Sequence, residues 1–339
     1  MKNLSKFIAI SFCMLSNCYL AFAQSNPKRD LSPPWYKRFV GKIGNETGII
    51  HIQKSYKGAL IMIYTYTQKL EFSDNSITFL DNKIEAKTEV KEKATQVFRA
   101  YLQNDRLLGT LQVGLYSMNI DAKEDYTQAI RVKLYEYSYV ETGNFPTFIG
   151  EAKYYYHYGL NAVPEYLISD FERQNILKDT YKKYMEGLKG EIKAIENEQF
   201  LSETSFEKVI YNQNNLLIIA SIYYIYEGGA HGMYSGSYMH YDLEQKKIVQ
   251  LQDIFYPNYK AALGEIILRK AKEIGVHLYD DIQKIEPSGD FLLDEQGITF
   301  VYQPYEIAPY SEGIVEITLP YSEIRALLKP TGPHKRIMK

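Results

Sequence analysis

Residues 226–232 read Tyr226-Glu227-Gly228-Gly229-Ala230-His231-Gly232, and tyrosine-rich segments with alternating side chains flank them on both sides. Alternation is typical of β-strands, so we expect a long strand at 216–226 and a return strand at 234–243. A second segment, 304–313, reads Pro304-Tyr305-Glu306-Ile307-Ala308-Pro309-Tyr310-Ser311-Glu312-Gly313. Glycine lets the backbone turn sharply or approach a partner closely, and the flanking side chains supply hydrogen-bond donors and acceptors. The pattern therefore fits a binding pocket or a purely structural hairpin.

The sequence around this hairpin predicts an α+β domain over residues 150–330. Apolar residues recur at helical spacing from 164 to about 200 and again from 259 to 274. A closing helix is expected at 320–328, with a proline near its first turn. Further strands are expected at 154–158, 206–211, 291–293, 298–302 and 314–319. Strands mixed with helices indicate a mainly antiparallel sheet that is packed by helices.

The sequence of the preceding part, residues 35–145, predicts an antiparallel β-meander that curls into a small sandwich or partial barrel. Asn104-Asp105 stands where a hairpin turn belongs, and a break at 142–146 separates this module from the α+β domain. Strands are expected at 48–52, 59–67, 76–80, 96–103, 107–115 and 130–139. The whole chain is therefore expected to be α+β, with a β-rich module first.

The first 23 residues are typical of a signal peptide. Lys2 and Lys6 precede an apolar run at 7–15, and Ala21-Phe22-Ala23 is a small-x-small cleavage site. A lipoprotein signal is the alternative, with Cys18 as the acylated residue. We therefore expect an extracytoplasmic protein, either periplasmic or secreted or anchored to the envelope by a lipid, with a linker at 24–34.

Cysteine and charge exclude several classes of function. Both cysteines, Cys13 and Cys18, lie in the leader, so a chain cleaved after Ala23 has no disulfide, no thiol nucleophile and no cysteine-ligated metal. The chain carries 39 Lys+Arg against 41 Asp+Glu, and loss of Lys2 and Lys6 leaves 37 against 41, or a net charge of -4. This balance predicts no nucleic-acid partner. After the leader, no apolar stretch approaches membrane-spanning length.

Several motifs of the second domain occur together in one order. They are the 226–232 run, Asp242-Leu243, Leu251-Gln252-Asp253-Ile254-Phe255, the 302–313 segment and Leu319-Pro320-Tyr321. In combination they resemble the extracytoplasmic domain shared by the anti-sigma-V factor, a transmembrane lysozyme receptor, and by a peptidoglycan deacetylase. The resemblance covers about residues 150–330. It implies an α+β module that binds a protein, which is lysozyme for the best-understood member.

The sequence departs from both relatives in the parts outside this domain. It has no sigma-binding segment or membrane-spanning helix like those of the receptor. It also has neither the paired-aspartate motif nor the His-x-x-x-His metal pair of the deacetylase. We therefore expect a binding protein rather than an enzyme, with no cofactor and no metal.

His231 and three glutamates are the candidates for acid–base chemistry. Imidazole serves as base, acid or metal ligand near neutral pH, but a metal would need more ligands than His240 and scattered carboxylates. The alternative is that His231 bonds to a backbone carbonyl and pins the turn. Two of Glu227, Glu306 and Glu312 would suit a glycoside hydrolase, whereas glutamates beside glycine turns usually bind backbone amides.

Tyrosine is the more informative candidate, because the chain has 32 tyrosines and one tryptophan. A tyrosine ring offers area and its hydroxyl offers a hydrogen bond, which suits sugar-binding, protein-binding and half-buried strand positions alike. If the 304–313 loop folds over the glycine hairpin, these rings line one groove; otherwise they form a tyrosine-rich core edge. The predicted binding residues are Glu227, His231, Tyr234, Tyr302, Tyr305, Glu306, Tyr310 and Glu312, with Tyr238 beside them.

These residues lead to two functional hypotheses. The first is an envelope protein that binds a lysozyme-like protein or a peptidoglycan fragment. The second is a hydrolase of cell-wall glycans. The first is preferred because no recognisable catalytic set accompanies the motifs.

Overall fold

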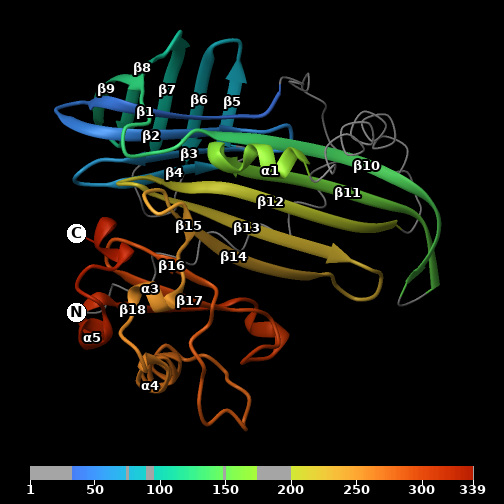
Figure 1. Cartoon of the computed structure of the whole chain (residues 1–339). Helices are drawn as coiled ribbons and strands as arrows, with labels where there is room; N and C mark the ends of the chain where they lie inside the picture. The colour runs from blue at the N-terminus through green and yellow to red at the C-terminus, as the bar shows by residue number, and fades with distance from the viewer. Residues whose placement is uncertain (1–32, 74–75, 89–94, 148–149, 174–199, 339) are drawn as a thin grey trace.

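The computed structural model describes residues 33–73, 76–88, 95–147, 150–173 and 200–338. The leader and residues 24–32 of the expected linker lie outside these ranges. The described residues form three sheets, and Figure 1 shows the central sheet between an N-terminal barrel-like sheet and a small C-terminal sheet.

The N-terminal sheet is an antiparallel meander of nine strands that curls into a near-barrel. Its strands are β1 (Trp35–Ile43), β2 (Glu46–Lys54), β3 (Ala59–Tyr64), β4 (Lys69–Ser73), β5 (Ile77–Leu80), β6 (Lys83–Thr88), β7 (Gln96–Gln103), β8 (Arg106–Val113) and β9 (Tyr116–Glu124). They pair in the order β4-β3-β2-β1-β9-β8-β7-β6-β5. Alternate side chains such as Phe39, Ile50 and Phe98 fill the interior. The predicted meander is confirmed.

Strands β2 and β3 are buried on both faces, because the near-barrel is packed against the rest of the molecule. Ile61 and Ile63 point into the near-barrel core. Leu60, Met62 and Tyr64 point outward and join the core of the C-terminal sheet. A strand covered on both sides loses the usual alternation of apolar and polar residues.

The central sheet is built on one long hairpin. Its strands are β10 (Val132–Thr147), β11 (Gly150–Pro164), β12 (Phe200–Gln213), β13 (Leu216–Tyr226), β14 (Met233–Asp242) and β15 (Lys247–Ile248), in that order. β11 pairs with β12 in parallel, and the other pairs are antiparallel. Figure 1 shows the β10–β11 end projecting beyond the other sheets.

The predicted break at 142–146 is wrong, because β10 continues through it. The strand passes these residues with a register shift between Thr142 and Phe145. Cross-strand pairing with the tyrosine-rich start of β11 carries the strand past Gly143, and a bulge absorbs the irregularity. The helix expected from 164 is present at η3 (Glu165–Leu167) and α1 (Ile168–Arg173), and its remaining part lies outside the described residues.

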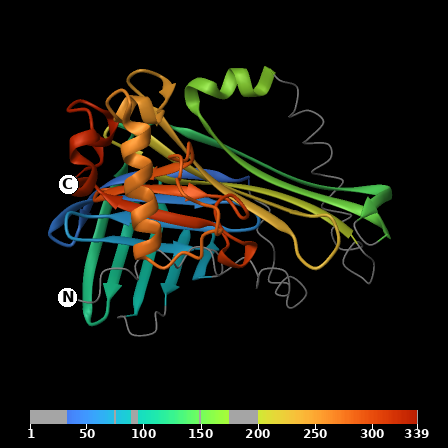
Figure 2. The same cartoon turned by 90° about the horizontal axis from the view of Figure 1, so that it is seen from below.

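The C-terminal sheet is antiparallel and helix-packed, so the α+β fold is confirmed. Figure 2 shows α4 (Tyr259–Glu273) lying across it, and Leu263, Ile267 and Ala271 bury the apolar face of this helix. The other elements are α3 (Leu251–Ile254), β16 (Phe291–Leu293), β17 (Gly297–Tyr302), η4 (Tyr310–Glu312), β18 (Val315–Pro320), α5 (Tyr321–Ile324), η5 (Arg325–Leu327) and η6 (Pro333–Arg336). Among the described residues, no helix is long and apolar enough to cross a membrane.

A buried polar cluster joins the near-barrel to the central sheet. We call it the seam, and it consists of Tyr36, Arg38, His51, Gln53 and Asn212. The Asn212 side chain donates to the Tyr36 hydroxyl at 3.1 Å and to the carbonyl of residue 130 at 2.8 Å, and it accepts the amide of that residue at 3.0 Å. Arg38 Nε donates to the Asn212 carbonyl at 2.8 Å. Burial lowers the pKa of His51 to about 3, so this imidazole is neutral.

Candidate functional site

The glycine run forms the turn between β13 and β14, as the sequence predicts. Gly228 and Gly229 have φ values of 90° and 97°, which only glycine adopts without strain. A Cβ on Gly232 would lie 2.4 Å from the Tyr224 ring, so a larger residue here would displace the end of that side chain. The residue types of the turn are therefore explained by its backbone.

His231 packs on Tyr310 and joins this hairpin to the 304–313 loop. The two rings stack with centroids 4.0 Å apart and planes 18° apart. The Tyr310 hydroxyl donates to the Gly232 carbonyl at 2.7 Å, and His231 Nδ1 lies 3.1 Å from the same oxygen. Both rings therefore fix the loop to the turn, although the His231 side chain stays exposed.

Two further tyrosines surround Tyr310. Tyr234 meets it edge-on at 5.8 Å, and Tyr305 lies 5.5 Å from it in a tilted arrangement. Burial raises the pKa of Tyr234 and of Tyr310, so both hydroxyls remain protonated donors. We call His231, Tyr234, Tyr305 and Tyr310 the aromatic surface.

Tyr305 is the strained member of the aromatic surface. Its φ is 70°, in the left-handed region that disfavours a residue with a Cβ, and its side chain is 50% exposed. Such a conformation costs about 1–3 kcal/mol and is kept only where the surroundings enforce it. Tyr305 follows Pro304 in a tight turn that the Glu306 amide closes on the Gln303 carbonyl at 3.0 Å. The turn therefore imposes this φ while the ring stays half-exposed.

Gln303 holds the loop against the hairpin, a role that sequence reasoning missed. Its Oε1 accepts the Gly236 amide at 3.0 Å, and its Nε2 donates to the Gly236 carbonyl at 2.7 Å. Nε2 also donates to Asp290 Oδ2 at 3.2 Å. The side-chain amide thus pairs with the outer edge of β14 as a neighbouring strand would. Its place inside the 302–313 motif was the only signal available.

The candidate glutamates do not form a pair. Glu306 Oε2 accepts the backbone amide of Gln303 at 2.8 Å, within its own loop. Glu312 Oε1 lies 2.6 Å from His277 Nδ1. Glu227 is exposed at the start of the turn. Each carboxylate therefore has a separate local environment.

Two candidate tyrosines lie in the core rather than at the surface. Tyr302 is 1% exposed, and its hydroxyl donates to the Glu286 carbonyl at 2.9 Å. The Tyr238 hydroxyl donates to Glu316 Oε1 at 3.4 Å. Burial raises the pKa of the Tyr238 hydroxyl and that of the Glu316 carboxyl. Tyr302 is buried and Tyr238 is partly buried against the same core, so both rings support the sheets beneath the site.

His240 is also a core residue. Burial lowers its pKa to about 3, and its Nε2 accepts the Leu293 amide at 3.1 Å. Its ring stacks on Phe291 at 4.7 Å. Within the described residues, no group of three His, Cys, Asp or Glu side chains is placed to hold a metal ion.

Comparison with known proteins places one family domain at this site. Residues 252–322 match the DUF3298 family model. The family is described as "Protein of unknown function", and the matched segment includes α4, the C-terminal sheet and the loop with Tyr305 and Tyr310. No curated protein matches the chain.

Solved structures of DUF3298 proteins are also similar. A family member from Bacteroides fragilis NCTC 9343 is 22% identical, and the match covers 61% of this chain and 97% of that chain with a TM-score of 0.43. A DUF3298 family protein from Pseudomonas aeruginosa PAO1 is 20% identical, with 63% and 100% covered and a TM-score of 0.41.

Proposed function

We propose that the protein is an extracytoplasmic binding module that recognises a protein partner through the aromatic surface. The observation that carries this proposal is Tyr305, a half-exposed ring held at a φ of 70°. The turn at 303–306 holds this ring at the surface beside Tyr310, where a partner can contact it. The Gln303 clamp and the Tyr310 hydrogen bond hold the surface in place, which lowers the entropy lost on binding.

The ring geometry favours a protein over a glycan. His231 and Tyr310 cover one face of each other, so neither ring offers both faces to a pyranose. The exposed residues here are His231, Tyr305 and the neighbouring Met233, which is 39% exposed. Tyrosine and methionine are enriched at protein interfaces, where a few such residues dominate affinity. A peptidoglycan fragment is the alternative partner that the experiment below distinguishes.

The leader and the resemblance support the location and the class of partner. A signal peptide at 1–23 would carry the chain across the membrane. The motif resemblance to a lysozyme receptor favours a lysozyme-like protein. A wall-glycan hydrolase has less support, because a carboxylate on each side of the scissile bond is required and Glu306 and Glu312 are bonded to separate groups.

Calorimetry with lysozymes and with muropeptides tests the proposal. We expect a lysozyme-like protein to bind, and we expect His231→Ala to weaken binding at least ten-fold through loss of the ring that packs on Tyr310. The matched control is Tyr116→Ala on β9, where another exposed ring lies far along the chain from the site. Binding of muropeptides alone would identify the glycan alternative. Turnover of muropeptides that Glu306→Gln abolishes would overturn the binding proposal.

A further inference from the structure

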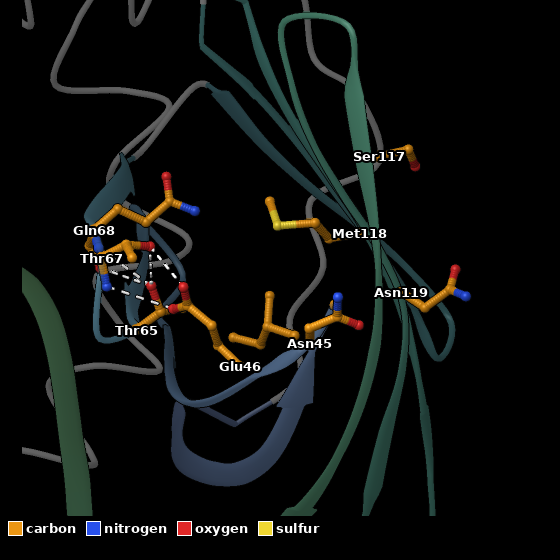
Figure 3. Close-up of a pocket in the computed structure, with 10 residues that line it drawn as sticks. Asn45, Glu46, Thr65, Thr67, Gln68, Ser117, Met118 and Asn119 are labelled. Atoms are coloured by element: carbon orange, nitrogen blue, oxygen red, sulfur yellow. Dashed lines mark hydrogen bonds between the residues drawn. The ribbon is translucent and has the colours of Figure 1, made fainter.

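A second site lies in the near-barrel, independent of the aromatic surface. A hollow of about 490 Å³ opens at one end of it, between the β1–β2 turn, the β3–β4 turn and the start of β9 (Figure 3). Its size lies within the range of small-molecule sites, and the mouths of β-barrels are frequent locations for them. Its lining includes Ile43, Gly44, Glu46, Thr67, Gln68 and Met118.

One wall of the hollow is apolar. Ile43 is buried at the near-barrel end, and Met118 points into the hollow in Figure 3. Gly44 has a φ of 60°, and a Cβ there would lie 3.1 Å from the Met118 side chain. Glycine therefore keeps the turn tight without crowding Met118.

The opposite wall presents a carboxylate that neutral groups hold in place. The Thr67 hydroxyl donates to Glu46 Oε1 at 3.0 Å, and the Thr67 amide donates to Oε2 at 3.4 Å. Hydrogen bonds from Thr65 and from Thr67 lower the pKa of Glu46, so it is ionised at neutral pH. Figure 3 shows Glu46, Thr67 and Gln68 on the same side of the hollow.

Among the described residues, no cationic side chain pairs with Glu46, whereas three other carboxylates of the near-barrel each have one. Asp121 is 2.5 Å from Arg106, Glu85 is 2.7 Å from Arg99, and Asp105 is 3.2 Å from Lys123. Lys42, on the adjacent strand, has its Nζ 3.5 Å from the Thr47 hydroxyl. A fixed carboxylate with only neutral protein partners is available to accept charge-assisted hydrogen bonds from a cationic ligand.

We propose that the hollow binds a small organic cation with a primary ammonium group. The ammonium donates to Glu46, and the carbon skeleton of the ligand packs on Met118. The amides of Asn45 and Gln68, at the rim, bond to hydroxyl or amide groups of the ligand. An amino sugar and the amino end of a short peptide both have this chemistry.

Methyl NMR of the protein with ¹³C-methyl methionine tests the site, because Met118 reports directly on the hollow. The ligands are glucosamine, alanyl-alanine amide and, as a neutral control, N-acetylglucosamine. We expect a saturable shift of the Met118 signal with at least one amine and none with N-acetylglucosamine. Met118→Leu assigns the signal.

Two glutamate variants, one inside the hollow and one outside it, test whether Glu46 binds the ligand. Glu46→Gln removes one charge from an exposed position, and we expect it to weaken binding at least ten-fold. Glu71→Gln, on β4 of the same near-barrel, should leave binding unchanged. A shift with either amine supports the site and identifies the source as sugar or peptide. The site is refuted by absence of a shift with both amines, by an equal shift with N-acetylglucosamine, or by full binding in Glu46→Gln.

Discussion

Tyrosine, histidine and amide side chains gather at two places in the molecule, the buried seam and the exposed aromatic surface. In the seam, Asn212 is fully buried and both ends of its amide are bonded. In the aromatic surface, His231 and Tyr305 are exposed and Tyr305 is strained. A buried polar group that loses its partner costs about 1–3 kcal/mol, whereas an exposed one turns to water. The same residue types therefore stabilise the fold at the seam and remain available to a partner at the surface.

The largest loss of stability is expected from Asn212→Ala. The substitution leaves the Tyr36 hydroxyl and the amide and carbonyl of residue 130 without their partner, which should lower the free energy of unfolding by about 3 kcal/mol. Urea unfolding measures the change. The control is Asn119→Ala on β9, an exposed asparagine that should change stability by less than about 0.5 kcal/mol. Equal effects of both substitutions would contradict the role of the seam.

Acid should destabilise the fold through its buried histidines. The pKa of His51 and that of His240 are lowered to about 3, well below their usual value, because burial disfavours the charged ring. Stability from a neutral histidine is complete above about pH 6.5 and is lost as the pH falls toward 3. Between pH 7 and pH 5, each of these histidines should contribute a loss of about 2 kcal/mol.

His240→Gln isolates one of these contributions. Glutamine retains an acceptor for the Leu293 amide but does not titrate. Urea unfolding at pH 7 and pH 5 should therefore show a loss that is smaller by about 2 kcal/mol in the variant. The same pH dependence in the variant and the parent would show that His240 is not buried in its neutral form.

A loss of stability smaller than that of Asn212→Ala is expected where the C-terminal segment meets the central sheet. Arg336 donates to Asp242 at 2.9 and 3.2 Å, and the Asp242 side chain is 2% exposed. Burial alone would raise the pKa of Asp242, but the hydrogen bonds from Arg336 and from two backbone amides lower it overall. Arg336→Ala should cost about 2 kcal/mol. Arg99→Ala, which removes an exposed ion pair with Glu85, should cost less than about 1 kcal/mol.

Regular elements with one clear pattern could be predicted from the sequence. β13 and β16 match the predicted ranges 216–226 and 291–293, and α4 ends one residue before the predicted 274. Here alternation or helical spacing is uninterrupted, and glycine or polar turns mark the ends. From the sequence, the first strand is expected at 48–52 and none over β1, because Phe39-Val40-Gly41 interrupts the alternation of apolar and polar residues.

Contacts between distant segments could not be predicted. Gln303 reaches Gly236 across 67 residues, and Arg38 reaches Asn212 across 174 residues. The residues that neighbour Gln303 and Arg38 in the sequence do not distinguish these two side chains from polar side chains that are exposed to solvent. The candidate site was therefore predicted in part: His231, Tyr234, Tyr305 and Tyr310 come together, while the burial of Tyr302 depends on the packing of three sheets.

The smallest effect on stability, with the largest effect on binding, is expected from Tyr305→Gly. Glycine relieves the strain at a φ of 70° and loses only the contact with Tyr310, so the free energy of unfolding should change by less than about 1 kcal/mol. Calorimetry with a lysozyme-like protein, beside urea unfolding of the same sample, tests this directly. We predict nearly unchanged stability and at least ten-fold weaker binding. Unchanged binding, or a loss of stability like that of Asn212→Ala, would contradict the assignment of the aromatic surface as the binding site.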